Sequence, residues 1–469
     1  MMRPVLGALA LLVLSDVAGH ANLVIGSGAT QNMHCSGGVC APIARDAVLN
    51  VTDLANMLAS QAVEVTTTGS NAQASSIVIT APLSWSNANG LALQAYQSIA
   101  IEAPVTVGSA AALTLSTYDG TLSFRDKGSV TFQSLASALT INNTAFTLVD
   151  SVTTLANAIA SNPSGSYALA NAYDASGDGT YTRPPVGTVF SGLFEGLGNA
   201  ISSLTVNDPE ADRNVGLFAQ VSGAVRDVGL VDVNVAGGSS KSGSEDVGTL
   251  IGLLDTGGTV SGSFASGSVS AGSGGVSLGG LIGYSMGDVS LSHANVQVSD
   301  NTTQKSDIFA GGLIGSSLGT VERSFSAGPV ASTGEGWFGG FVGENVEGTI
   351  SNCYETGSVS SSSGEGGFAG ATGDDSVIAE SYAAGLVSGG AEGLTGGFVG
   401  QTQVAFSDDY WDVTTTKQNT GGGNGNVAGI TGLTSNELRS GLPDGFTPGI
   451  WAQKRTLNKG FPYLIGNAP

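Results

Sequence analysis

Short apolar phrases flanked by glycine recur seven times between residues 215 and 400, as in Gly312-Leu313-Ile314-Gly315. One glycine in each phrase marks its position: Gly216, Gly248, Gly280, Gly312, Gly340, Gly367 and Gly397. These marker glycines are separated by 32, 32, 32, 28, 27 and 30 residues. Self-similarity at such a period is typical of proteins built from stacked repeats. The sequence therefore predicts one solenoid coil per phrase.

Each coil is expected to hold three short strands joined by turns. Equivalent strands would stack ~4.8 Å apart in parallel sheets, so that Leu313, Phe341, Phe368 and Phe398 form an interior column. Glycine at each corner would permit backbone conformations closed to other residues. A helical repeat is excluded because Gly, Ser and Val have poor helix propensity. The predicted fold class is an all-β parallel β-helix.

Residues 62–150 carry short runs in which apolar and polar positions alternate, such as Leu113-Thr114-Leu115 and Val130-Thr131-Phe132. A period of two is the pattern of a half-buried strand. The runs follow one another too closely for crossover helices. We therefore expect N-terminal coils of the same β-helix here.

Two segments show helical spacing instead, residues 51–60 after a possible N-cap at Asn50 or Thr52, and residues 151–161. The first is expected to cap the first coil, and aromatic residues near the C-terminus to cap the last one. The predicted boundaries are 1–21 signal peptide, 22–61 cysteine-pair segment and helical cap, 62–150 N-terminal coils, 151–200 connector with a short helix, 201–405 glycine-repeat β-helix and 406–469 C-terminal cap.

The first residues resemble a secretory signal, with Arg3, an apolar run from Val5 to Leu14 and small residues up to Ala21. The run is shorter than the ~20 residues that span a bilayer, and no later segment is long and apolar enough. We therefore expect an extracytoplasmic protein without a transmembrane segment. The net charge of -22 opposes binding to phosphate backbones, so nucleic acid is not an expected partner.

Three cysteines fit an oxidising compartment. Cys35 and Cys40 are predicted to form a disulfide. The alternative is a metal site with the adjacent His34, but a structural zinc site needs four ligands. Cys353 is expected to be a buried core residue.

Candidate catalytic groups are sparse. Asp174 with Asp178, Asp374 with Asp375 and Asp408 with Asp409 are the carboxylate pairs that a carbohydrate-active enzyme or a calcium site would use. Each pair lies among turn residues, where Asp is ordinarily structural. Two Gly-x-Ser-x-Gly matches, at Ser285 and Ser317, lack the helix that follows a nucleophile elbow. We expect no catalytic residue and no cofactor, with calcium as the alternative. Trp337 is a candidate surface contact, unless it packs against a neighbouring coil.

The repeats resemble the GLUG motif, which Gly280-Leu281-Ile282-Gly283 and Gly312-Leu313-Ile314-Gly315 match directly. With residues 190–201, Tyr410-Trp411-Asp412 and Phe461-Pro462-Tyr463-Leu464, the chain from about residue 70 to 465 is similar to filamentous-haemagglutinin-like surface proteins of Gram-negative bacteria. The resemblance implies a secreted or surface-displayed, right-handed β-helix with a role in adhesion. GLUG repeats also accompany some zinc peptidases, but their His-Glu-x-x-His motif is absent from this sequence, whose histidines are His20, His34 and His293.

The predicted function is that of a non-enzymatic, exported, adhesin-like protein. It would bind a host, matrix or cell-surface glycan or protein through repeated weak contacts. One alternative is a polysaccharide lyase or hydrolase, and another is a structural surface-layer or spacer component. A charged groove across three or more adjacent rungs would favour the enzyme.

Overall fold

The computed structural model describes residues 22–68, 74–241, 244–300, 308–391, 394–402, 404 and 406–469, so the predicted signal peptide lies outside the described residues. Strands and turns make up almost all of this part of the chain, with four short α-helices, and nearly all strand pairs are parallel. The prediction of an all-β parallel β-helix is confirmed. Within the described residues no helix has the length and apolar character needed to cross a membrane.

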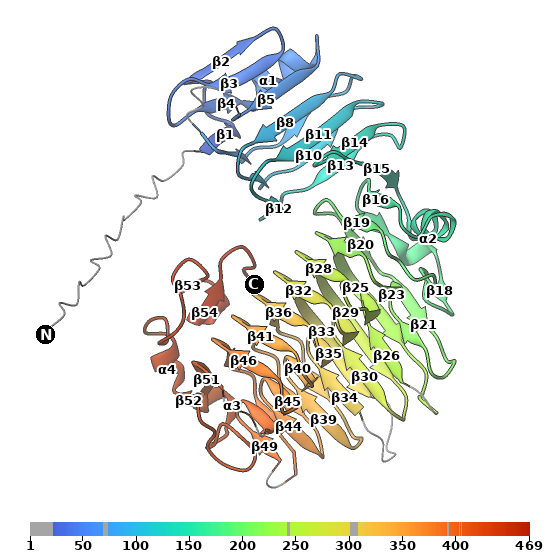
Figure 1. Cartoon of the computed structure of the whole chain (residues 1–469), viewed down its shortest axis with the longest axis vertical. Helices are drawn as coiled ribbons and strands as arrows, with labels where there is room; N and C mark the ends of the chain where they lie inside the picture. The colour runs from blue at the N-terminus through green and yellow to red at the C-terminus, as the bar shows by residue number, and fades with distance from the viewer. Residues whose placement is uncertain are drawn as a thin grey trace, which may run out of the picture.

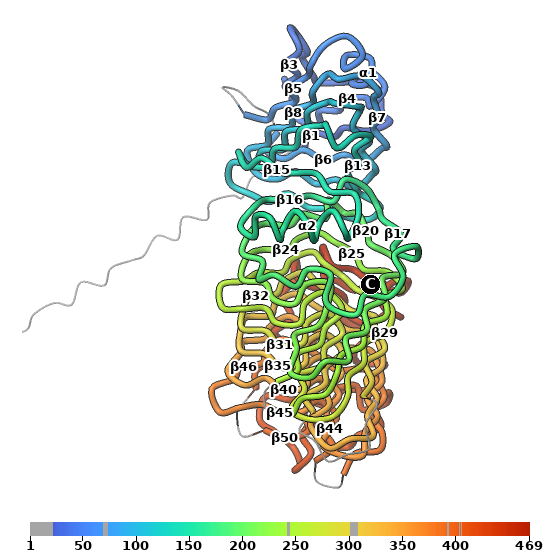
Figure 2. Tube along the Cα trace, turned by 90° about the vertical axis from the view of Figure 1, so that its right-hand side faces the viewer, coloured from blue at the N-terminus to red at the C-terminus, as the bar shows by residue number. Residues whose placement is uncertain are grey.

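Two β-helical modules stack along one long axis (Figures 1 and 2). The N-terminal module covers residues 22–143 and the C-terminal module residues 144–433. Each has its own apolar core. The remaining residues, 434–469, form a strap that runs back along the outside of the C-terminal module.

Three sheets build the N-terminal module. One contains β1 (Asn22–Gly26), β4 (Val48–Asn50), β6 (Ser76–Ile79), β9 (Ile99–Ile101) and β12 (Leu122–Phe124), and a second contains β7 (Leu83–Ser84), β10 (Val105–Val107) and β13 (Val130–Phe132). The third begins the long sheet of the molecule, with β2 (Met33–Ser36), β3 (Val39–Pro42), β5 (Val63–Thr66), β8 (Leu91–Ala95), β11 (Ala112–Thr117) and β14 (Ala138–Ile141). Because β1 pairs with β6, the first coil begins within the segment expected to be only a cap.

The local features predicted for the N-terminal segment are present. Helix α1 (Val51–Leu58) buries Leu54 and Leu58, and the Asn50 side chain caps it by accepting hydrogen bonds from two backbone amides. Strands β2 and β3 form an antiparallel hairpin that places Cys35 opposite Cys40. The predicted Cys35–Cys40 disulfide is confirmed.

The chain reverses direction between the two modules. Strand β15 (Thr144–Val149) pairs antiparallel with β14 through a turn at Asn142 and Asn143, whose φ angles of 46° and 65° asparagine tolerates well. From β15 onward the long sheet continues in parallel, but its strands run the opposite way. Leu148 belongs to the N-terminal core and its neighbour Val149 to the C-terminal core. The face of the long sheet that is interior in the first module is therefore exterior in the second.

From β19 to β50 each coil of the C-terminal module contributes to four sheets, so the expectation of three strands per coil was too simple. The long sheet continues through β16 (Ser166–Leu169), β19 (Leu193–Glu195), β24 (Ala224–Arg226), β28 (Thr259–Ser261), β32 (Asp288–Ser290), β36 (Thr320–Glu322), β41 (Thr349–Ser351) and β46 (Val377–Ala379). Helix α2 (Val152–Ser161) lies in the predicted connector and packs Leu155 and Ile159 into the core.

A second sheet, here called the aromatic-face sheet, follows the long sheet around the coil. It contains β20 (Ala200–Ser202), β25 (Gly229–Ala236), β29 (Phe264–Ala271), β33 (His293–Asp300), β37 (Phe325–Ser326), β42 (Tyr354–Glu355), β47 (Tyr382–Ala383), β51 (Asp409–Asp412) and β52 (Ile430–Leu433).

Two further sheets meet at the marker glycines. One contains β22 (Asn214–Val215), β26 (Glu245–Gly248), β30 (Val276–Gly279), β34 (Ile308–Gly311), β39 (Gly336–Gly339), β44 (Gly364–Gly366) and β49 (Thr395–Gly396). The other contains β23 (Phe218–Val221), β27 (Ile251–Leu254), β31 (Ile282–Ser285), β35 (Ile314–Ser317), β40 (Val342–Asn345), β45 (Ala369–Thr372) and β50 (Val399–Gln401).

The marker glycines are required for a reason other than the one predicted. None of the seven has a positive φ. Instead, a Cβ on Gly280 would lie 2.0 Å from the carbonyl oxygen of Gly312, and a Cβ on Gly312 would lie 2.0 Å from that of Gly340. From Gly280 onward, adjacent rungs come too close at this position for a side chain. The preceding coil carries Thr249 there, because Gly248 is in register with Gly279, and the Thr249 hydroxyl donates to the Gly280 carbonyl oxygen at 2.6 Å.

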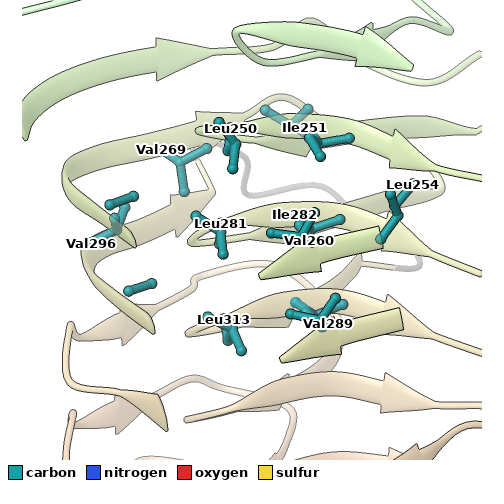
Figure 3. Packing of buried hydrophobic residues seen from close by; sticks show 14 of the residues in the cluster. Leu250, Ile251, Leu254, Val260, Val269, Leu281, Ile282, Val289, Val296 and Leu313 are labelled. Carbon is teal, nitrogen blue, oxygen red and sulfur yellow. The ribbon is translucent and has the colours of Figure 1, made fainter. Parts of the chain in front are cut away.

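From Gly280 onward, the residue after each marker glycine points into the core, as predicted, and in the preceding coil Leu250, two residues after Gly248, takes this place. Leu250, Leu281 and Leu313 stack in one column (Figure 3). The column continues with Phe341, Phe368 and Phe398, whose rings stack at 4.6 and 4.9 Å between centroids.

The C-terminal segment does more than the predicted cap. Strands β51 and β52 extend the aromatic-face sheet, and Trp411 joins the core, so these residues do cover the last coil. The strap then leaves the end of the solenoid. Its Phe446, Trp451 and Phe461 pack against Tyr354 and Tyr382 on the outer side of the aromatic-face sheet.

The substitution Gly312→Ala tests the close approach of the rungs. The added Cβ would collide with the Gly340 carbonyl oxygen, and we expect the free energy of unfolding in urea to fall by roughly 1–3 kcal/mol. The matched control is Gly441→Ala in the strap, where an added Cβ meets no atom within 4 Å. Equal effects of the two substitutions would contradict this explanation of the repeat.

Candidate ligand-binding cleft

A cleft of about 600 Å³ lies between the two modules. Its walls are β12 and the turn after it, the outer side of the long sheet from β19 to β36, and the end of the strap, which Figure 1 places around the gap between the modules. An adjoining cavity of about 520 Å³ shares Phe124, Arg125 and Asp227 with it. The charged residues that line the larger cleft are Arg125, Glu195, Arg226, Asp227, Asp288 and Arg323.

The floor of the cleft follows from the register of the long sheet. Glu195 stands opposite Arg226, Arg226 opposite Ser261, and Ser261 opposite Ser290. Neighbouring strands are ~4.8 Å apart, so these positions form one column on the outer side of the sheet. The groove therefore crosses β19, β24, β28 and β32 and reaches Arg323, directly after β36, with charged side chains on each of these rungs except that of β28. It spans more than the three rungs named as the criterion for an enzyme.

A stacked turn holds the next residue of each rung at the edge of the cleft. Asp227, Gly262, Leu291 and Arg323 all have φ between 50° and 59°. For residues other than glycine this left-handed conformation is uncommon and costs about 1 kcal/mol or more. The residue after Asp227, Gly262 and Leu291 in turn donates its amide to a serine hydroxyl of the next rung at 3.2–3.5 Å.

That following residue belongs to a ladder of small hydroxyl side chains. The amide of Ser263 donates to Ser292 Oγ and the amide of Ser292 to Ser324 Oγ, both at 3.2 Å. Cys353 takes the same position in a later coil, where its amide donates to Ser381 Oγ. Cys353 is buried, as predicted, and its place in the ladder explains why a small side chain stands there.

Two carboxyl groups meet at the floor of the cleft. Glu195 is buried, and its Oε1 accepts a hydrogen bond of 3.1 Å from the amide of Leu197. Burial raises the pKa of Glu195 well above its usual range, and the neighbouring Asp227 charge raises it further. Burial also raises the pKa of the partly exposed Asp227 to about 7, against the opposing influence of Arg226 and of a hydrogen bond with Glu195. Burial therefore favours the protonated form of both carboxyl groups.

The strap end forms the opposite wall. Asn467 Nδ2 donates to the carbonyl oxygens of Ser292 and Arg323, and Arg323 Nη2 donates to that of Ile465. The His293 ring stacks between two phenylalanines, with its Nδ1 3.0 Å from Asn467 Oδ1. Burial lowers the pKa of His293 to about 4, so this histidine is neutral and holds the strap in place.

The carboxylate pairs proposed from the sequence lie outside this cleft. Asp174 accepts a hydrogen bond from the amide of Ser176, and Asp178 accepts from the hydroxyls of Tyr173 and Tyr181. These contacts fit the structural role of Asp in turns.

The other two pairs are also accounted for by turns. Asp374 and Asp375 occupy the turn before β46, and Asp408 has a left-handed φ of 56°. Asp409 is buried and accepts a hydrogen bond from the amide of Ser381, which ends the hydroxyl ladder. Among the described residues no group of three or more His, Cys, Asp or Glu side chains is placed to hold a metal ion.

Trp337 packs against the neighbouring coil. It is half-buried in β39, in register with Phe309, and its ring covers Gly364, where an added Cβ would lie 2.2 Å from the indole. Ser285 and Ser317 are buried in strands, so neither is presented as a nucleophile.

The sequence did not reveal the cleft residues. Glu195 and Arg226 occupy a strand position that carries serine in the next two coils. A charged residue at a position that is serine in other coils was the signal in the sequence that could have indicated the cleft. Neither a comparison with protein-family models nor one with curated proteins finds a match to this chain. The resemblance to GLUG and haemagglutinin-like proteins therefore stays a prediction.

Asp227→Asn tests the raised pKa. A carboxyl group whose pKa is higher in the folded than in the unfolded protein stabilises the fold fully below its unfolded-state pKa, near 3.8 for Asp227. This contribution is lost as the pH rises through the folded-state pKa of about 7. Between these pH values the wild-type free energy of unfolding should fall more steeply than that of the variant, by up to ~1.4 kcal/mol per pH unit. Urea unfolding measured across this range gives both slopes.

The matched control is Asp246→Asn, because burial also raises the pKa of Asp246 to about 7 but Asp246 does not line the cleft. Asp246→Asn should remove a similar part of the pH dependence of the free energy of unfolding. Parallel pH profiles of the wild type and the Asp227 variant would show that Asp227 has no raised pKa.

Proposed function

We propose that this chain is an exported binding protein whose inter-module cleft takes a segment of an anionic polymer. One observation carries the proposal: a cleft crosses five rungs and gathers Arg125, Arg226 and Arg323 in a chain that has only 15 Lys and Arg residues and a net charge of -22. Cations concentrated in one place on an acidic protein favour a ligand with carboxylate or sulfate groups.

The spacing of the arginines suits an extended ligand. Arg226 is the last residue of β24, and Arg323 comes directly after β36. Three rung spacings of ~4.8 Å, about 14 Å in total, therefore separate their backbones. The exposed guanidiniums of Arg125 and Arg226 can each bind one carboxylate or sulfate through two parallel hydrogen bonds. Arg323 contributes its positive charge, while its Nη2 donates to the Ile465 carbonyl oxygen. Burial raises the pKa of Glu195 and so disfavours a negative charge at that position, which leaves Asp227 and Asp288 as the other carboxyl groups of the cleft.

Adhesion at the cell surface remains the expected setting. The predicted signal peptide and the Cys35–Cys40 disulfide both fit an oxidising compartment outside the cytoplasm. Compared with the prediction from the sequence, the proposal replaces repeated weak contacts along the rungs with one cleft. A purely structural spacer does not require arginines grouped in a cleft.

The double variant Arg125→Ala/Arg226→Ala tests this proposal. Both side chains are exposed, so the fold should survive, while the affinity for an acidic ligand should fall at least tenfold because charge-assisted hydrogen bonds are lost. Residues 22–469 would be screened on an array of uronic-acid, sulfated and sialylated glycans together with acidic peptides, and affinities measured by calorimetry.

The control is Arg45→Ala/Arg455→Ala, which removes two exposed arginines outside the cleft. The proposal fails if no acidic probe binds the wild type, or if both double variants bind as the wild type does.

Hydrolysis of a polysaccharide is the second candidate function, favoured by the Glu195 and Asp227 pair. A carboxyl group with a pKa of about 7 is suited to general acid and base catalysis near neutral pH. Asp227 would give its proton to the departing glycosidic oxygen, while water adds to the other fragment and returns a proton to the pair. Glu195 would position Asp227 and hold the shared proton.

Asp227→Asn distinguishes the two functions. If the chain is a hydrolase, the wild type releases reducing ends from the polysaccharide that it binds, with a rate that falls above pH ~7, and the variant binds it but releases at least a hundredfold less. If the wild type binds the polysaccharide without releasing reducing ends, the hydrolase function is refuted and only the binding function remains.

A further inference from the structure

Two tyrosines form an exposed stack on the N-terminal module. The rings of Tyr96 and Tyr118 lie 5.4 Å apart between centroids with an angle of 20° between their planes. Tyr96 is 45% exposed and Tyr118 80% exposed. Neither ring belongs to an apolar core of the described residues, so the fold does not need them for burial.

The rungs fix the position of this stack. The amide of Tyr118 donates to the carbonyl oxygen of Ala95, and the amide of Asp119 donates to that of Tyr96. The two tyrosines therefore occupy equivalent positions on consecutive coils. Their backbones are held as firmly as the strands beside them.

The stack ends where the cleft begins. Tyr118 is two residues before Gly120, which lines the cleft with Thr121, and Thr117 Oγ1 donates to the Gly120 carbonyl oxygen at 2.9 Å. The amide of Thr117 donates to Asn142 Oδ1 at 2.8 Å, and Asn142 is also a cleft residue.

The coil after Tyr118 turns into the β14–β15 hairpin and adds no third aromatic ring. One face of Tyr118 is covered by Tyr96, and its 80% exposure leaves the other face open. A flat apolar face with a hydroxyl at its edge is suited to the C–H face of a sugar ring, whose own hydroxyls remain in water. Acidic peptides offer no regular succession of such faces.

We propose that Tyr118, backed by Tyr96, is a sugar-stacking platform at the mouth of the cleft, and that the anionic polymer is therefore an acidic polysaccharide. The inference rests on the proposed function, because the cleft supplies the charged contacts and the platform supplies the ring contact. It narrows the ligand class from anionic polymers in general to chains of sugar rings.

Tyr118→Ala and Tyr118→Phe test the platform, with residues 22–469 titrated against uronic-acid and sulfated hexasaccharides and against a hexaglutamate peptide. Loss of one stacking contact should weaken hexasaccharide binding roughly tenfold, whereas Tyr118→Phe keeps the ring and should bind within about twofold of the wild type. In saturation-transfer NMR, the sugar C–H protons should lose their signal in the alanine variant only. Leu135→Ala is the control, because Leu135 is a 45% exposed apolar residue on the same module.

The outcomes separate this inference from the proposed function. If Arg125→Ala/Arg226→Ala loses hexasaccharide binding but Tyr118→Ala does not, the cleft is a binding site and the platform is refuted. Hexaglutamate binding as tight as that of the hexasaccharides would refute the sugar specificity. If the wild type binds neither kind of probe, the proposed function fails and the platform with it.

Discussion

The close approach of adjacent rungs at the marker-glycine corner is the constraint on which the rest of the C-terminal module depends. A Cβ at Gly312 would fall 2.0 Å from a carbonyl oxygen of the next rung. Glycine therefore recurs at this position from Gly280 to Gly397, and the coil before it carries Thr249, whose hydroxyl donates to the Gly280 carbonyl oxygen. The sharp corner turns the next residue inward, and equivalent side chains then stack along the axis. The leucine and phenylalanine column and the parallel register of all four sheets follow from this repeated corner.

Stacking in register also orders the outside of the solenoid. Positions that carry serine in some coils carry Glu195 and Arg226 in others, and the rung spacing fixes their separation. The left-handed turn at Asp227 and Arg323 and the buried hydroxyl ladder behind it hold these groups in place. Such a preformed surface loses little conformational entropy when a ligand binds.

The sequence predicted those features that depend on local pattern. The glycine period gave the coils, helical spacing gave α1 and α2, and the spacing of Cys35 and Cys40 gave the disulfide. The reason for the glycines was missed, because a contact between coils leaves no trace in one coil's own pattern. The reversal at Asn142 and Asn143 was missed because alternation with a period of two is the same for a strand running in either direction.

The cleft could not be predicted without that reversal. Reversing the long sheet moves the core to its other face, so the outer side of β19 to β36 comes to lie beneath the end of the N-terminal module. The strap then adds residues from the far end of the chain, with Asn467 bonded to Ser292 across 175 positions. Glu195, Asp227 and Arg125 are brought together only by these long-range contacts.

The most direct test is a crystal structure of residues 22–469 with an acidic hexasaccharide bound. We predict an antiparallel β14–β15 hairpin, with the sugar chain lying across Arg226 toward Arg323 and one ring stacked on Tyr118. A continuous parallel solenoid without the hairpin, or a hexasaccharide bound away from the cleft, would contradict it.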